Sequence, residues 1–237
     1  MVLRAFSAIA WFPRLRRSAS YAGVCLLLIL LTTFLLASSV PAKAALRIAD
    51  DAPHARLWRQ LYRQMPACWK TARTVFLQEV SDEEMDRLVE RTRHRNRDEA
   101  RDDSLVDGCY ESGGPHEDDF PTITLRDSLN GEERSLVFTH EYGHFVWDEI
   151  LTDAQRGRYA RLWRQLKRSG HLVTEYAGDS EEEGFAECFA YSLRRPGLLQ
   201  RRSPEAAQFL RTLAADLQAA KDDRGAADEE EDRDSSF

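Results

Sequence analysis

The sequence predicts a helix-rich α+β domain with a small sheet. Apolar residues recur at helical spacing in several long segments, and three short segments are rich in β-branched and apolar residues. A third observation concerns the segment 131–151, which is apolar on nearly all sides beyond its first turn. A helix without a polar face is a buried one, so we expect this helix to lie inside the domain.

The elements predicted before residue 130 alternate between helix and strand. Apolar residues recur at helical spacing within 51–69, which predicts an amphipathic helix. The β-branched segment 71–80 predicts a strand, and the charged segment that begins at Ser81 predicts a helix with a solvated face. Two further strands flank a Gly/Pro/acid loop, as a hairpin or as neighbouring strands: 104–110 and 120–128.

The elements predicted after the buried helix are all helical. One helix covers 152–170, with a cap near Thr152 or Asp153 and a stop at Gly170. A second covers 180–194 and is ended by Pro196-Gly197. A last helix is predicted at 203–220. The remaining segment, 221–237, has no apolar periodicity and is predicted to be a disordered acidic tail.

The first 44 residues differ in kind from the rest. Arginines precede an apolar stretch from Tyr21 to Ala37, and Ala42-Lys43-Ala44 fits the pattern of a signal-peptidase site. We predict that 1–44 is a signal peptide and that the protein is exported, to the periplasm or the medium. The alternative is an uncleaved anchor at about 21–40, since about 18 apolar residues can span a bilayer.

Charge limits the partners of the mature chain, whose predicted domain is 45–220. Without the leader the chain has 28 basic and 40 acidic side chains, a net charge of −12. This balance argues against binding nucleic acid or an anionic membrane, so we expect membrane association only if the leader stays uncleaved. The composition does not indicate which oligomeric state the protein has.

Three cysteines remain beyond the leader, which is an odd number. In an oxidising compartment, a bridge between Cys68 and Cys109 is the natural prediction, with Cys188 buried. A metal site built from all three is disfavoured because no C-x-x-C spacing occurs.

The buried helix contains the sequence HEYGH, from His140 to His144. Residues at i and i+4 lie about 40° apart around a helix, so both imidazoles can reach one metal ion. Glu141 projects about 100° from His140, where it can hold a water without binding the metal. This is the H-E-x-x-H arrangement of zinc hydrolases, and it predicts Zn²⁺ on His140 and His144 with Glu141 as general base.

A catalytic zinc site usually takes three protein ligands and keeps one open position. The metzincin extension would need a glycine and a histidine three and six residues after the motif, where the chain has Trp147 and Ile150. That family is excluded. The third ligand therefore comes from elsewhere, and the acid-rich segment EYAGDSEEEGFAECFAYSL, 175–193, supplies candidates.

The chain resembles the gluzincin metallopeptidases, most of all the family of the anthrax lethal factor catalytic domain. That family combines an H-E-F-G-H helix, a tyrosine, and E-F-F-A-E beginning seven residues after the tyrosine. This chain has HEYGH, Tyr176, and EGFAE beginning at Glu183. The likeness covers about 130–193 and departs from the pattern at Gly184, where the family has a bulky aromatic residue.

The resemblance implies a zincin-like metallopeptidase fold with a small sheet beside the active-site helix. It implies Glu183 as the third zinc ligand and Tyr176 as the hydroxyl that steadies the oxyanion or the leaving amine. The resemblance also matches Glu187 and Asp148 to acids that support the ligating histidines without binding the metal themselves. A strand at 122–124 would be the sheet edge that pairs with an extended peptide.

Alternatives for Glu183 stay open at the level of sequence. Ser180-x-x-Glu183 fits a capping box, which would turn the carboxylate back onto the backbone. A cap at Asp179 with Glu182 as its partner would release Glu183 for the metal. Glu187 is the next candidate ligand, and Glu181 and Glu182 are predicted to be solvated.

The sequence therefore predicts an exported zinc metallopeptidase that hydrolyses peptide bonds with a Glu-activated water. Its partner would be a peptide or protein substrate. One alternative is a non-catalytic zinc domain that binds a partner in the cell envelope. Another is a zinc amidase that acts on cell-wall peptides.

Overall fold

The computed structural model describes residues 46–71, 73–95, 106–113 and 120–234. All described residues belong to one compact unit. The predicted leader, 1–44, lies outside the described residues. The described part is rich in helix and has one small mixed sheet, which agrees with the predicted α+β class. None of the described helices combines the length and apolarity needed to cross a bilayer.

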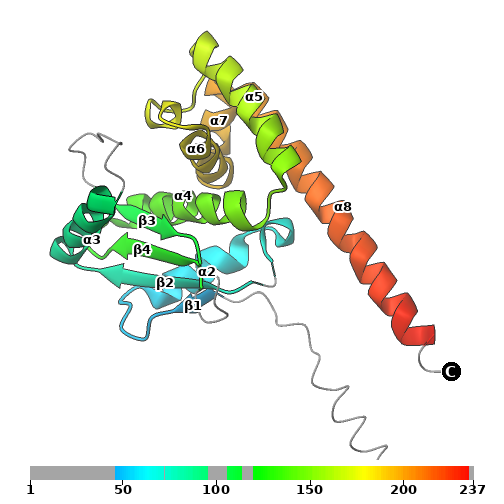
Figure 1. Cartoon of the computed structure of the whole chain (residues 1–237), viewed down its shortest axis with the longest axis horizontal. Helices are drawn as coiled ribbons and strands as arrows, with labels where there is room; N and C mark the ends of the chain where they lie inside the picture. The colour runs from blue at the N-terminus through cyan, green and yellow to red at the C-terminus, as the bar shows by residue number, and fades with distance from the viewer. Residues whose placement is uncertain (1–45, 72, 96–105, 114–119, 235–237) are drawn as a thin grey trace, which may run out of the picture. The chain divides into compact units, whose positions relative to one another are not determined.

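The sheet has four strands in the order β1-β2-β4-β3 (Figure 1). They are β1 (Leu46–Ile48), β2 (Val75–Val80), β3 (Gly108–Glu111) and β4 (Thr122–Arg126). β2 pairs in parallel with β1 and with β4. β3 and β4 are consecutive strands that pair antiparallel, which is the hairpin arrangement, one of the two that the sequence predicted. Since β4 is paired on both sides, the prediction that 122–124 forms the sheet edge is wrong. The edge on this side is β3.

The first predicted helix is shorter than expected. The single helix expected over 51–69 divides into α2 (Ala55–Gln64) and the 3₁₀ turn η1 (Ala67–Trp69). The break falls at Met65, whose backbone is extended because the residue before a proline avoids the helical region. The helix after Ser81 is α3 (Asp82–Arg95). The short strand β1 has no clear signal in the sequence.

The later helices begin at the residues that cap them. Asn130 caps α4 (Gly131–Glu149), and Thr152 forms a capping box on α5 (Asp153–Ser169), which Gly170 ends as predicted. The 3₁₀ turn η2 (Tyr176–Gly178) leads to α6 (Glu181–Arg194), capped by Ser180. Pro196 does not only stop α6: as a first-turn proline it also begins the short helix α7 (Pro196–Arg202).

The last helix, α8 (Pro204–Asp234), is longer than predicted. A disordered tail was expected from residue 221, but the helix continues to Asp234. Of this predicted tail, residues 235–237 lie outside the described residues. The segment 221–237 contains no proline, and its two alanines and three glutamates are good helix formers, whereas its five aspartates and Gly225 are poor ones. Lys221 also ties the helix to η1, because its Nζ donates to the carbonyls of Ala67, at 2.6 Å, and Lys70.

The predicted bridge between Cys68 and Cys109 is wrong for the part of the chain that the structure describes. Cys68 is buried in η1, which contacts α8, whereas Cys109 lies on the edge strand β3. The thiol of Cys109 donates instead to the carbonyl of Tyr110 at 3.8 Å. Cys188 is buried as predicted.

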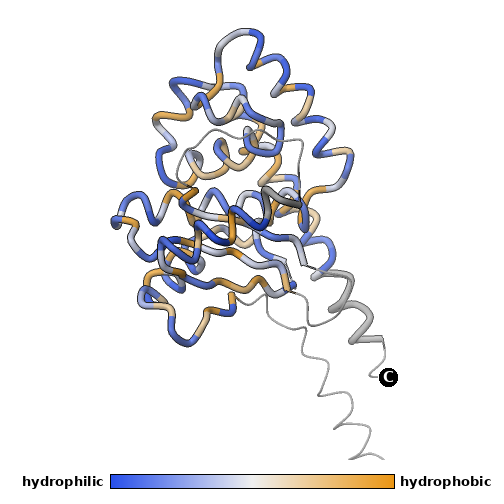
Figure 2. Tube along the Cα trace, turned by 60° about the vertical axis from the view of Figure 1, so that its left-hand side comes forward, coloured by the Kyte–Doolittle hydropathy of each residue, from blue (hydrophilic) through white to orange (hydrophobic). Residues whose placement is uncertain are grey.

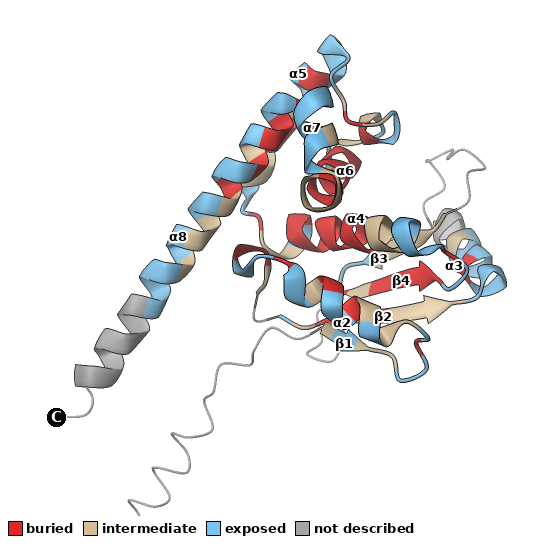
Figure 3. Ribbon diagram, turned by 180° about the vertical axis from the view of Figure 1, so that it is seen from behind, coloured by how far each residue is buried: buried red, intermediate tan, exposed pale blue. Residues whose placement is uncertain are grey.

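The buried helix α4 lies between the sheet and α6, and the surfaces of α4 and α6 that face each other are buried (Figures 1 and 3). Hydrophobic residues gather in this interior (Figure 2). The two helices approach closely at Gly143, where a Cβ atom would stand 2.8 Å from the Cα of Ala186. The glycine of HEYGH therefore sets the distance at which α6 packs on α4.

Gly184 has a packing reason as well. A Cβ atom there would lie 2.5 Å from Cδ1 of Trp163 on α5. The indole occupies this space and donates from Nε1 to the carbonyl of Ala177 at 2.8 Å.

Candidate metal centre

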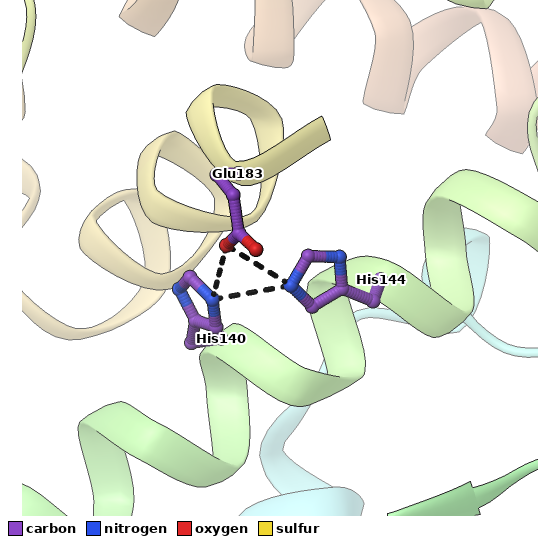
Figure 4. Close-up of side chains that lie close together, drawn as sticks. All are labelled: His140, His144 and Glu183. Carbon is purple, nitrogen blue, oxygen red and sulfur yellow. Dashed lines mark hydrogen bonds and ion pairs between the residues drawn. The ribbon is translucent and has the colours of Figure 1, made fainter. Parts of the chain in front are cut away.

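Three buried polar side chains meet between α4 and α6. His140 and His144 come from successive turns of α4, and Glu183 comes from the first turn of α6. The carboxylate of Glu183 points from α6 toward the space between the two imidazoles (Figure 4). Its Oε2 lies 3.1 Å from Nε2 of His140 and 3.3 Å from Nε2 of His144. Among the described residues, this is the one group of three His, Cys, Asp or Glu side chains that could hold a metal ion.

The spacing of the three donor atoms fits a tetrahedral zinc ion. Zinc binds nitrogen and oxygen at about 2.0–2.1 Å, so two donors on one tetrahedron stand about 3.3–3.4 Å apart. The separations from Oε2 of Glu183 are 3.1 and 3.3 Å, and the two Nε2 atoms are 3.2 Å apart. Two imidazoles and one carboxylate are also a donor set that zinc accepts in catalytic sites.

The helix cap does not draw Glu183 away from this group. Ser180, not Asp179, is the N-cap of α6, and its hydroxyl accepts from the backbone N–H of Glu183 at 3.0 Å. The reciprocal contact of a capping box, from the glutamate carboxylate to the cap N–H, is not formed, because the carboxylate turns to the histidines. The backbone of Glu183 thus serves the cap while its side chain serves the site.

The outer nitrogen of each imidazole meets a second glutamate of α6. Nδ1 of His140 lies 3.0 Å from Oε1 of Glu187, and Nδ1 of His144 lies 3.1 Å from Oε1 of Glu182. The hydroxyl of Thr174 donates to the other oxygen of Glu187 at 2.6 Å. Such outer acids fix the orientation of a metal-binding imidazole and direct Nε2 toward the metal.

Glu187 and Asp148 were predicted to support the two histidines, and the structure agrees with this prediction for Glu187 only. Glu187 contacts His140 as expected. Asp148 is exposed, and the hydrogen-bond partner of His144 on this side is Glu182, which was predicted to be solvated. The charge of Asp148 still acts through space: partial desolvation by its neighbours and repulsion by Glu182 raise the pKa of Asp148, and His144 lowers it.

The surrounding charges change the protonation of the three central groups. Burial opposes the charged imidazole, but hydrogen bonds to Glu183 and Glu187 outweigh it and raise the pKa of His140 to about 9. Burial likewise opposes the charge of His144, and contacts with Glu182 and Glu183 raise its pKa to about 10. Burial alone would raise the pKa of Glu183, yet its bonds to both imidazoles lower it well below the ordinary range. A metal cation would replace these protons.

Glu141 and two tyrosines complete the surroundings. Glu141 is buried, and its negative charge contributes to the raised pKa of both histidines, so it lies close to them. Tyr176 in η2 has its ring 5.6 Å from that of His140 and is 44% exposed. Tyr110 on β3 stacks on His144, with ring centroids 6.2 Å apart and planes 13° from parallel.

Sequence reasoning missed Tyr110, Thr174 and the contact of Glu182. Tyr110 is 34 positions from His144, on which it stacks, and Thr174 is also 34 positions from His140, which it supports through Glu187, so no local spacing could have indicated them. A comparison with protein-family models found no match to this chain, and a comparison with curated proteins found none either.

Proposed function

We propose that the protein is an exported, zinc-dependent metallopeptidase with a zincin-like domain. The observation that carries the proposal is the convergence of His140, His144 and Glu183 within 3.1–3.3 Å of one another, on two helices packed face to face. His140, His144 and Glu183 would hold the metal, which leaves one position of a tetrahedron for water or substrate. Glu141 comes from the same buried turn of α4.

The residues around the site have distinct roles in the proposed reaction. A zinc ion bound there supplies a Lewis acid and lowers the pKa of bound water toward neutrality. Glu141 takes a proton from the attacking water and delivers it to the leaving amine. Tyr176, exposed beside His140, donates a hydrogen bond where negative charge develops.

The sheet supports a peptide as the substrate. β3 is the edge of the sheet on the side of α4, and Gly108 at its start lies against Glu141. An exposed sheet edge can pair with an extended peptide through main-chain hydrogen bonds. A peptide on β3 would therefore run past the proposed base.

Metal analysis and a cleavage assay test the proposal together. The purified chain from 45 onward is expected to contain about one zinc per molecule and to cleave casein or members of a peptide library. Glu141→Gln should keep the zinc and lose about 10²–10⁴-fold in cleavage, which is the usual contribution of a general base. His140→Ala should lose both zinc and cleavage. Cleavage by Glu141→Gln at the wild-type rate would remove the assigned base.

Two other results would redirect the assignment. A zinc-loaded protein that cleaves nothing, with a fourth protein ligand on the metal, would indicate a partner-binding domain. Hydrolysis confined to cell-wall peptides would indicate a zinc amidase with the same ligands.

A further inference from the structure

Gly108 lies where the sheet meets helix α4. It is the first residue of the edge strand β3 and pairs with Leu125 of β4. Glycine weakens a strand unless a neighbouring group must approach the backbone closely. Backbone conformation does not explain its presence, because Gly170 is the only glycine with a positive φ among the described residues.

The space beside Gly108 is filled by side chains of α4. A Cβ atom at this position would lie 2.7 Å from Oε1 of Glu141, 2.9 Å from its Cγ and 2.7 Å from Cγ1 of Val137. Carbon atoms in ordinary contact stand about 3.5–4.0 Å apart, so even one methyl group does not fit. The carboxylate of Glu141 lies directly against the bare backbone of β3.

Helix α4 cannot retreat from the strand to make room. On its other side, Gly143 brings α4 so near α6 that a Cβ atom there would be 2.8 Å from the Cα of Ala186. The helix is held between β3 and α6, so added volume at Gly108 has to displace side chains. The end of a flexible glutamate moves more easily than a helix in a close-packed interior.

The strand presents alternate residues to the same helix. Successive side chains on a strand point to opposite faces, so positions 108 and 110 face α4 together. Gly108 meets Glu141, and Tyr110 stacks on His144. One short edge strand therefore contacts both the proposed base and a proposed metal ligand.

We propose that Gly108 is a positioning residue, whose missing side chain forms the slot that holds the carboxylate of Glu141 in place for proton transfer. The inference rests on the proposed function for its catalytic consequence. Its geometric part, the contact between Gly108 and Glu141, stands independently of any activity.

A double-mutant cycle tests the slot without an activity assay. Gly108→Ala should lower the melting temperature by roughly 2–10 °C, the range expected for one inserted methyl group in a packed site. In a Glu141→Ala background the same change should lower it by less, because Oε1 and Cγ of the glutamate are gone. Equal losses in both backgrounds would show that Glu141 does not occupy the slot, and would overturn the inference. Gly131→Ala is the matched control on α4, since nothing lies within 4 Å of its added Cβ.

Kinetics test the catalytic part. Gly108→Ala should bind zinc within about threefold of wild type, because the atoms nearest to its added Cβ belong to Glu141 and Val137 and not to a metal ligand. Its kcat should fall by about 10- to 100-fold through misplacement of the base. KM should change much less than kcat, and Gly131→Ala should match wild type in both. A wild-type kcat in Gly108→Ala would overturn the inference. If the wild-type protein cleaves nothing, the proposed function fails, and the melting cycle still decides whether the slot exists.

Discussion

The two imidazoles of the candidate metal centre have the same kind of outer partner in two different environments. At the His140 end, Glu187 is 11% exposed, and Thr174 donates to its second oxygen. At the His144 end, Glu182 is 45% exposed and shares its surroundings with the negative charge of Asp148. Tyr110 stacks on the His144 ring from the sheet side, and Tyr176 lies near the His140 ring.

This difference means that the hydrogen bond between carboxylate and imidazole differs in strength between the two ends. A charge-assisted hydrogen bond is stronger where water is excluded, and water screens an exposed pair. Because Thr174 already holds the carboxylate of Glu187, that side chain loses less conformational entropy when it orients the imidazole of His140. We therefore expect the His140 end to be the rigid half of the site and the His144 end to be the adaptable half.

Glu183 is the residue that both ends share, and its loss should have the largest effect. Glu183→Gln is expected to weaken zinc binding on the order of 10²–10³-fold, since the free energy of zinc binding would be shared among only three protein ligands. Competition with a chelator of known affinity measures the change. The control is Glu181→Gln, whose exposed side chain pairs with Arg164 at 3.8 Å and should leave binding unchanged. Equal losses in the two variants would remove Glu183 from the ligand set.

Two isosteric substitutions, Glu187→Gln and Glu182→Gln, test the comparison of the two ends. Glu187→Gln should weaken zinc binding by about 10- to 100-fold, the range found when an outer partner of a ligating histidine is removed. Glu182→Gln should weaken it by less than about 10-fold, because its carboxylate is already screened by water. Both are measured by the same chelator competition. If Glu182→Gln proves the more damaging, the assignment of rigid and adaptable ends is reversed.

Thr174 sharpens the comparison from outside the cluster. Thr174→Val removes the hydroxyl that donates to Glu187 at 2.6 Å and should weaken zinc binding by about 3- to 10-fold, as an indirect loss of that support. Because Thr174 acts through Glu187, the double variant should bind zinc no more weakly than Glu187→Gln alone. Additive losses would show that Thr174 acts by another route, such as its contact with the N–H of Ala177 at 3.0 Å.

A last prediction concerns stability instead of zinc binding: the stability of the zinc-depleted protein should depend on pH. The folded pKa values of His140 and His144 are raised, to about 9 and about 10, above an unfolded value of about 6.5. Their contribution to stability is fully present below pH 6.5 and is lost as pH rises through 9 to 10. Melting temperatures of the depleted protein should fall across this window, and Glu183→Gln should flatten the decline. A rise in stability over the same range would contradict the contacts.

Much of the fold could be predicted, and the errors have identifiable causes. The stop at Gly170 and the buried character of α4 follow from local patterns that the structure contains. For the caps of α5 and α6 the sequence left two candidates each, and the structure selects Thr152 over Asp153 and Ser180 over Asp179. The edge strand was misassigned because strand order is not encoded in the length or composition of 122–124. The helical tail was missed because helix propensity without apolar periodicity gave no indication that Lys221 ties α8 to η1.

The sequence by itself determined that two imidazoles stand together on one face of a buried helix, because a spacing of four residues fixes their angle wherever the helix lies. It did not determine which of four glutamates on α6 meets which nitrogen. That depends on the rotation and distance of α6 against α4, which the contacts of Gly143 with Ala186 and of Gly184 with Trp163 decide. Such contacts join segments far apart in the chain, and only close packing of the folded molecule brings them together.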